Sequence, residues 1–281
     1  MKDNKQEILM KNNKMIKAKY DLNLIENRAF QLILVRMQQK NEDTLIAEIL
    51  RKDFEKVLKK DLYKTKKGLT EVLDKLYDAK IYFIDEEGDG KARFINNFKF
   101  IENDTKVRIK ADAEIYKMLF HYLKGYTPIN LPIFFSFKSY YTQRLYEFLR
   151  LWTNTKKVIN YSIEELRDLL MLKNKYTLYK DFKRRVISIA IQELNEKSLM
   201  QIEIKEIKTG RKVTSINFIV KDNDKRKYFQ DKENETFNKE QQKKTYKKNY
   251  DEPKKLKFNN FDQREYDYDA LEKKLLGWDE D

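Results

Sequence analysis

The chain has 281 residues, of which 60 are lysine or arginine and 46 are aspartate or glutamate, giving a formal net charge of +14. A surplus of this size is typical of proteins that bind a polyanion, because each cationic side chain set against a phosphate releases a condensed counterion. Cysteine is absent and histidine occurs once, which excludes disulfides, thiolate metal sites and metal sites built from paired histidines.

Further classes of protein are excluded by segments that the sequence lacks. No apolar run approaches the roughly 20 residues that a membrane-spanning helix needs, and nothing resembles a signal peptide. The glycine-rich loop that cradles a nucleotide triphosphate is also missing. We therefore expect a cytoplasmic protein with no membrane partner, no metal and no cofactor.

In the N-terminal half, apolar residues first recur at helical spacing and then alternate as in strands. Residues 1–12 are polar and are predicted to be loose. Three helices are predicted at about 26–39, 51–59 and 65–79, followed by a hairpin of 81–84 with 93–100 and a third strand at 105–110. Lys64, Lys66 and Lys67 lie near the start of the third helix, where contacts with phosphates or a groove are expected. A solvated helix end is the alternative.

A proline-containing stretch at 126–135 is predicted to be the linker to a second half of similar order. This half starts with a helix at about 139–152 and a short β-like stretch at 158–160. Ser162 and Glu165 match a capping box, which starts a short helix at 163–172, and a turn follows at 173–177. A helix at about 179–196 and a hairpin with the basic tip 208–212 complete the half.

The helix at 179–196 has two distinct sides. At about 100° per residue, its apolar side consists of Phe182, Val186, Ile189, Ala190 and Leu194, and its polar side of Arg184, Arg185, Ser188, Gln192 and Asn195. One side is suited to packing, and the other presents cationic and amide groups. A short helix, such a helix and then a basic hairpin indicate a winged helix-turn-helix, in which one helix lies in the DNA major groove and the hairpin touches the flanking backbone.

The sequence thus predicts an α+β protein of two tandem winged-helix domains with a flexible C-terminal tail. Its predicted parts are the loose N-terminus at 1–12, a first domain at 13–125, the linker at 126–135, a second and main DNA-binding domain at 136–220, a charged flexible linker at 221–258 and a candidate docking peptide at 259–281. Residues 221–258 hold too few aliphatic side chains to offset the entropy of ordering.

The last segment combines apolar and acidic residues, as in a short peptide that docks on a partner. The apolar residues predicted to bind this partner are Phe261, Tyr266, Tyr268, Leu271, Leu275, Leu276 and Trp278. A helix that folds back on the second domain is the alternative.

Several stretches resemble a known family, in the family's order and spacing. The run YTQRLYEFL at 141–149 resembles the Arg-Leu-Tyr-Glu box of the iteron-type plasmid replication initiators, the Rep_3 or RepB-like family. The runs DFKRR at 181–185, ELN at 193–195 and GRKVTSINF at 210–218 resemble further boxes, and 13–24 resembles the family's opening segment. The resemblance implies two winged-helix domains, monomers that bind repeated iteron sites at a plasmid origin, and dimers that repress their own gene.

Carried over to this sequence, the resemblance implies that the second domain makes the main contacts with double-stranded DNA. The implied groove residues are Lys183, Arg184, Arg185, Ser188 and Gln192, and the implied hairpin residues are Lys208, Arg211 and Lys212. Arginine can pair bidentately with a guanine edge. On the helical wheel Arg184 and Arg185 face outward, whereas Lys183 lies nearer the apolar side. Helix solvation is the alternative for this basic triplet.

We therefore expect an initiator without an active site, which binds origin repeats, helps to open the adjacent DNA and recruits host replication proteins such as an initiator, helicase or loader. A homodimer in equilibrium with the monomer is expected to repress the initiator's own gene. A two-domain winged-helix transcription repressor with no origin function is one alternative. The other is a nicking or topoisomerase-like enzyme that uses one of the 18 tyrosines, against which the lack of a His-x-His motif argues.

Overall fold

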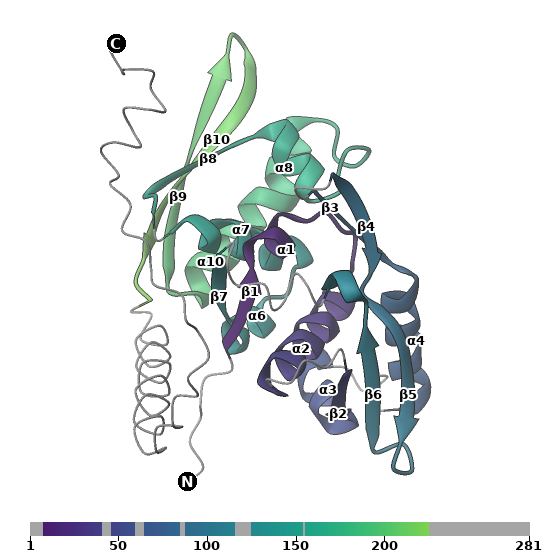
Figure 1. The fold of residues 1–281 in the computed structure, drawn as a ribbon. Coiled ribbons are helices and arrows are strands. Elements are labelled where there is room, and N and C mark those ends of the chain that lie inside the picture. The colour runs from purple at the N-terminus through teal and green to yellow at the C-terminus, as the bar shows by residue number, and fades with distance from the viewer. Residues whose placement is uncertain are drawn as a thin grey trace, which may run out of the picture. The chain divides into compact units, whose positions relative to one another are not determined.

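The computed structural model describes residues 8–40, 46–59, 65–84, 88–115, 125–153 and 155–224 (Figure 1). The first half of this region contains β1 (Ile8–Asn12), α1 (Asn13–Lys17), α2 (Leu24–Lys40), β2 (Ile46–Leu50), α3 (Arg51–Leu58), α4 (Lys66–Asp78), β3 (Lys80–Ile84), β4 (Asp89–Arg93), β5 (Ile95–Ile101) and β6 (Lys106–Ala111). The second contains β7 (Tyr126–Asn130), α6 (Leu131–Ser136), α7 (Tyr140–Trp152), β8 (Val158–Ser162), α8 (Ile163–Leu169), α9 (Tyr179–Phe182), η3 (Lys183–Ile187), α10 (Ser188–Lys197), β9 (Met200–Thr209) and β10 (Lys212–Asp222). The predicted α+β class is confirmed.

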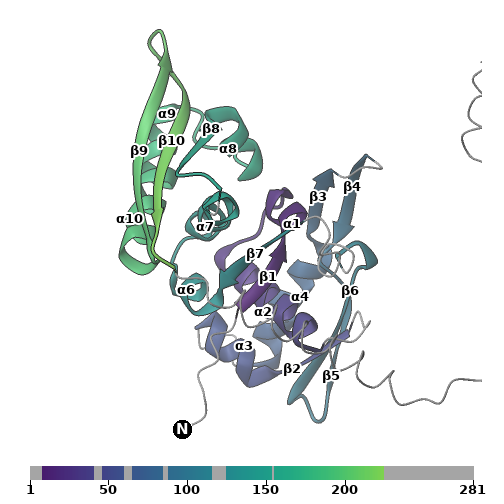
Figure 2. The same ribbon diagram turned by 60° about the vertical axis from the view of Figure 1, so that its left-hand side comes forward.

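The two halves repeat one order of elements. Each starts with a strand and a short helix, β1–α1 or β7–α6, and continues with a longer helix, α2 or α7. A strand, a helix pair and a hairpin follow, and the strand before the helix pair lies beside the last strand of the hairpin (Figure 2). The resulting sheet orders are β2-β6-β5 and β8-β10-β9. The two predicted winged helices are therefore present, each preceded by a strand-helix-helix unit.

The core of each winged helix follows from the residue spacing. In β2 and β6, alternate residues point to one face, so Ala47 lies opposite Ile109 and Ile49 opposite Val107, and all four are buried. The apolar stripe predicted for the third helix is buried in α4, namely Leu69, Val72, Leu73 and Leu76. The helix stripe and the inward sheet face thus form one core.

The pairing predicted for the first hairpin is wrong. β3 pairs with β4, with Ile81 opposite Ala92, whereas β5 pairs with β6, with Phe98 opposite Ile109. The predicted strand 93–100 is therefore divided between β4 and β5. The β3–β4 hairpin has no counterpart among the described elements of the second half, and two backbone hydrogen bonds of 2.8 and 2.9 Å join Tyr82 to Lys19.

The two halves are joined by an antiparallel ribbon of β1 and β7, in which Leu9 lies opposite Ile129 and both are buried. The prediction of a loose N-terminus is therefore wrong for residues 8–12, while residues 1–7 lie outside the described residues, and the prediction of a linker at 126–135 is wrong. Pro128 suggested a loop, but it is compatible with this ribbon because both strands of a two-stranded ribbon are edge strands. Each strand ends in an asparagine, Asn12 or Asn130, whose side chain caps the short helix that follows.

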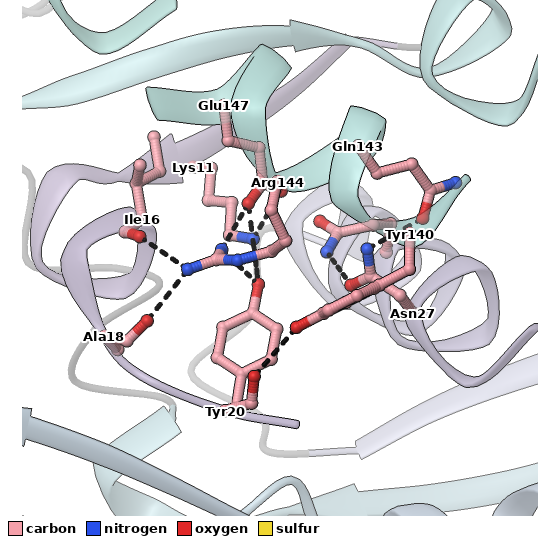
Figure 3. Close-up of polar contacts among 10 residues, drawn as sticks. Lys11, Ile16, Ala18, Tyr20, Asn27, Tyr140, Gln143, Arg144 and Glu147 are labelled. Atoms are coloured by element: carbon pink, nitrogen blue, oxygen red, sulfur yellow. Dashed lines mark hydrogen bonds and ion pairs between the residues drawn. The ribbon is translucent and has the colours of Figure 1, made fainter. Parts of the chain in front are cut away.

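Two arginines cross between the halves in opposite directions. Arg144 of α7 donates to the carbonyls of Ile16 at 3.0 Å and Ala18 at 2.9 Å, at the end of α1 (Figure 3). Arg28 of α2 donates to the carbonyls of residues 135 and 137 at 3.0 and 2.7 Å, at the end of α6. In each case one acceptor is the carbonyl of the C-cap residue of the short helix, Ala18 or Phe137. The other is the carbonyl of the residue two positions earlier.

The residues just before these arginines meet each other. Asn27 donates from Nδ2 to Oε1 of Gln143 at 2.9 Å, and both side chains are buried (Figure 3). The two halves are thus related by an internal two-fold arrangement, in which equivalent residues exchange equivalent contacts. We call this buried region, made by β1, β7, α2, α7 and the two short helices, the seam.

A buried group of charges lies in the seam. Arg144 donates to Tyr20 Oη at 2.6 Å and to Glu147 Oε2 at 2.5 Å, while Lys11 Nζ lies 2.7 Å from Glu147 Oε1 (Figure 3). All four side chains are buried. Burial lowers the pKa of Lys11 to about 8, although Glu147 opposes the shift. α7 is therefore buried on the side that carries Arg144 and Glu147 as well.

The second half extends beyond the predicted boundary at residue 220. Arg150 of α7 is buried and forms ion pairs with Asp222, at 2.7 Å, and with Asp224. The first residues of the predicted flexible linker therefore belong to the folded second half, and the rest of the C-terminal segment lies outside the described residues. In the described part of the chain, no helix is long and apolar enough to cross a membrane.

Candidate nucleic-acid interface

The helix pair of the second half is held by a cap and by one arginine. Ser162 Oγ accepts a hydrogen bond from the backbone N–H of Glu165 at 3.0 Å, as the capping box predicts. α8 ends at Leu169, earlier than predicted. Arg167 donates to the carbonyls of residues 175 and 177, both at 3.1 Å. The turn is thereby fastened to α8, which sets the direction of the next helix.

The helix predicted at 179–196 is present but contains one wide turn. It consists of α9, η3 and α10, where η3 is a π-helical turn in which the N–H of Ser188 donates to the carbonyl of Lys183. A π turn accommodates one extra residue and rotates all later residues relative to an ideal α-helix. Consequently Ile187 is fully buried, whereas Ile189, predicted on the apolar side, is 48% exposed. The other predicted apolar residues are buried: Phe182, Val186, Ala190 and Leu194.

Five side chains form what we call the exposed face of this helix: Arg184, Arg185, Ser188, Ile189 and Gln192. Arg184 pairs with Asp181 at 2.9 Å and Gln192 donates to Glu196 at 2.9 Å, both within the helix. An ion pair at such an exposed position is weak, so a ligand can displace Asp181 from Arg184. Arg185 has no carboxylate partner among the described residues.

Lys183, also predicted to contact DNA, lies against the hairpin. Its Nζ is 2.6 Å from Glu206 of β9, which also accepts a hydrogen bond from the Tyr179 hydroxyl at 2.7 Å. The hydrogen bonds from Lys183 and Tyr179 lower the pKa of the Glu206 carboxyl, which therefore stays ionised. These contacts fasten the first turns of the helix to the hairpin. A DNA contact by Lys183 stays a prediction.

The hairpin β9–β10 ends in a basic tip. Thr209 pairs with Lys212 across the two residues Gly210 and Arg211. Gly210 has φ +60°, as the first position of a type II′ turn requires. Lys208, Arg211 and Lys212 are all exposed, and no carboxylate in the described ranges forms an ion pair with them. Three cations are thus free to meet an anionic surface.

Two residues of the second half have positioning roles that the helical wheel did not reveal. Asn195, assigned to the polar side, exchanges two hydrogen bonds of 3.0 and 2.7 Å with the backbone of Ile202 in β9. Glu193 is buried and accepts a hydrogen bond from the backbone N–H of Lys138 at 2.6 Å. These contacts fix α10 to the hairpin and to the segment before α7. The only signal for them in the sequence was the ELN run at 193–195.

The corresponding surface of the first half differs in charge. Lys66 and Lys67 are exposed at the start of α4, but Lys66 Nζ pairs with Asp104 at 2.9 Å. Asp104 and Glu102 lie in the turn between β5 and β6, which is acidic where the β9–β10 tip is basic. Lys64 lies outside the described residues, as do the predicted docking residues between Phe261 and Trp278. No cluster of His, Asp or Glu in the described ranges is suited to a metal ion.

Comparisons with known proteins match both halves. A family model described as initiator replication protein, WH1, matches residues 8–150, and one described as initiator Rep protein, WH2, matches residues 162–220. A replication initiation protein from Escherichia coli is 30% identical over 132 residues, which are 46% of this chain and 40% of that protein. The crystal structure of the Pi initiator protein in complex with iteron DNA matches with a TM-score of 0.59 and 18% identity, over 79% of this chain and 100% of that chain.

The solved structure supports the fold, since at 18% identity it resembles this chain in architecture. The family models go further, because together they match the ribbon, the helix pairs and the hairpins of both halves. The chain belongs to the initiator replication proteins that carry two winged-helix domains.

Proposed function

We propose that this chain initiates the replication of a plasmid by binding direct repeats, the iterons, at the plasmid origin. The observation that carries the proposal is the exposed face of the helix in the second half, which presents Arg184 and Arg185. The ion pair between Lys183 and Glu206 holds this helix against the basic hairpin. In winged-helix proteins such a helix enters the major groove while the hairpin meets the backbone. The Pi initiator, whose structure resembles this chain, was crystallised with iteron DNA.

Each group has a role that its chemistry suits. Arg184 and Arg185 offer paired N–H donors to the O6 and N7 atoms of guanine, and Gln192 offers a donor and an acceptor to adenine. Arg211 and Lys212 of the tip bind phosphates, which fixes the register without reading sequence. The first half contributes weaker phosphate contacts, because the acidic tip next to Lys66 opposes them.

The proposed initiator makes and breaks no bonds and is not an enzyme. Binding to several repeats bends the DNA, at a cost of about 1–6 kcal/mol that the added contacts offset, and so helps to open the adjacent AT-rich segment. In the same proposal, the monomer is in equilibrium with a homodimer that represses the initiator's own gene. Residues 259–281 recruit a host replication protein such as an initiator, helicase or loader.

Footprinting of the protein on the DNA that flanks its own gene tests the proposal. We expect protection of tandem direct repeats, and log K that falls by about 0.9 per phosphate contact as log salt rises. Arg185→Ala should weaken protection of the repeats, whereas Lys91→Ala, which removes an exposed cation of β4, should leave it unchanged. Protection of a single palindrome would favour the transcription repressor instead, and a flat salt response would refute both.

A truncated chain tests the role of the tail. Deleting 259–281 should abolish plasmid maintenance while footprints on the repeats stay intact. If plasmid maintenance survives the deletion, the tail does not recruit an essential host protein. If the footprints disappear, the tail acts in DNA binding.

A further inference from the structure

The π turn changes which isoleucine of the recognition helix reaches the solvent. An uninterrupted α-helix would place Ile189 with Val186 and Ala190 on the buried side. Because η3 accommodates one extra residue, Ile187 occupies the core instead, and Ile189 is 48% exposed. The helix therefore presents a bulky aliphatic side chain on the side that carries the cationic and amide groups.

Exposure alone assigns nothing, because single aliphatic side chains are common on protein surfaces. The position of Ile189 is what matters. In α10 the exposed side chains are Ser188, Ile189, Gln192, Asn195 and Glu196, so Ile189 is the aliphatic member of an otherwise polar row. Its neighbours one turn away along the helix are Arg185 and Gln192, which are suited to base edges.

The major groove offers one kind of apolar group, the C5-methyl group of thymine. The polar groups of the base edges there are hydrogen-bond donors or acceptors, and an isoleucine satisfies none of them. We propose that Ile189 contacts the C5-methyl group of a thymine in each repeat and so determines specificity at that base pair. This inference rests on the proposed function, namely that the exposed face of the second half enters the major groove.

The contact selects thymine against cytosine through the methyl group alone. The isoleucine gains apolar contact with the C5-methyl group, which cytosine lacks, whereas it bonds neither the O4 atom of thymine nor the N4 amino group of cytosine. A serine or glutamine at position 189 could accept a hydrogen bond from cytosine N4 or donate one to thymine O4, and would therefore lose the discrimination. The π turn is thus the backbone feature that places an apolar reader between polar ones.

Single replacement of each thymine in one repeat by deoxyuridine provides the test, because it removes the methyl group and leaves every hydrogen-bonding group in place. We expect one position at which deoxyuridine weakens binding of the wild-type protein by roughly fourfold, the value of burying one methyl-sized group. Ile189→Ala should weaken binding to the thymine probe by at least as much. At that position the variant should bind the thymine and deoxyuridine probes equally well.

Ile219→Ala is the matched control, since Ile219 is 41% exposed on β10, where it pairs with Val158. This variant should keep the wild-type response to deoxyuridine, and thermal melts should show that both variants fold. The inference is overturned if no thymine position responds in the wild type, or if Ile189→Ala keeps the full response. Absence of any protected repeat would overturn the proposed function together with this inference, whereas binding without a methyl response overturns the inference alone.

Discussion

Replacing Arg144 by methionine tests how strongly the seam holds the two halves together. The guanidinium donates to four acceptors at 2.5–3.0 Å, namely Tyr20 Oη, Glu147 Oε2 and the carbonyls of residues 16 and 18. Methionine retains a long unbranched side chain, so the apolar packing is largely preserved. The two carbonyls lose a donor in a buried site, and Glu147 keeps Lys11 as its ion-pair partner.

The magnitude follows from these losses. Removing one partner of a buried ion pair costs about 3–5 kcal/mol. Each buried carbonyl left without a donor adds about 1–3 kcal/mol, although the effects of one side chain are not additive. We expect the free energy of unfolding to fall by about 4 kcal/mol or more, a large part of the roughly 5–15 kcal/mol of a typical domain. Arg184→Met, in the exposed face, should change it by less than about 0.5 kcal/mol.

Urea unfolding followed by circular dichroism measures both variants under the same conditions. Arg28→Met, the equivalent change in the first half, should also lower the unfolding midpoint, because it removes a donor to the carbonyls of Phe135 and Phe137, of which, among the described residues, only Phe135 keeps another donor, Lys59 at 3.2 Å. A loss below about 1 kcal/mol for Arg144→Met, no larger than that of the exposed arginine, would refute the view that the crossing arginines stabilise the seam.

Three further predictions concern a buried lysine, two glycines and the hairpin. Burial lowers the pKa of Lys11 in the folded chain from the ordinary lysine value of 10.5 to about 8. The unfolded chain therefore binds more protons between these pH values, and wild-type stability should rise with pH from 8 to 10.5, by at most about 3.4 kcal/mol. Urea midpoints of Lys11→Met should lack this rise, and a shared rise would exclude Lys11 as its source. Gly125→Ala should lower the free energy of unfolding in urea by about 1–2 kcal/mol, because φ is +84° and the new Cβ would lie 2.8 Å from the Asn13 amide. Gly210→Ala should lower it by less, because the new Cβ at φ +60° would meet open space. Arg211→Ala should reduce the slope of log K against log salt by about 0.9 and weaken binding to all sequences alike, and an unchanged slope would remove it from the phosphate contacts.

Local signals in the sequence sufficed for the helix pairs and for the hairpin of the second half, whereas they gave the wrong pairing for the first hairpin. Ser162 caps α8 as its spacing to Glu165 predicts, and the apolar stripe of α4 is buried as its spacing predicts. The π turn escaped prediction because Ile187 and Ile189, which flank Ser188, are the same residue type. The sequence therefore gives no sign of which of the two is buried. Which of them enters the core is decided by the fit against the sheet and α7, which the helical wheel does not contain.

The seam escaped prediction for a different reason. Lys11, Arg144 and Glu147 are residue types that are rarely buried, so their presence in a segment suggests solvent exposure. Their burial becomes understandable only with the partner from the other half, since the residues that bond Arg144 at positions 16 and 18 are more than a hundred residues away in the sequence. The Arg-Leu-Tyr-Glu run at 144–147 marked these residues without revealing what they contact.

The reciprocal contacts across β1 and β7 have a consequence for how the chain behaves on dilution. Two surfaces that exchange equivalent contacts about a two-fold axis form an isologous interface, the type found between identical subunits. Here both surfaces belong to one polypeptide, so their association is unimolecular and their effective concentration is set by the connecting chain. A homodimer of separate winged helices loses its partner as its concentration falls. This chain keeps two winged helices paired at any concentration, even at a single molecule per cell.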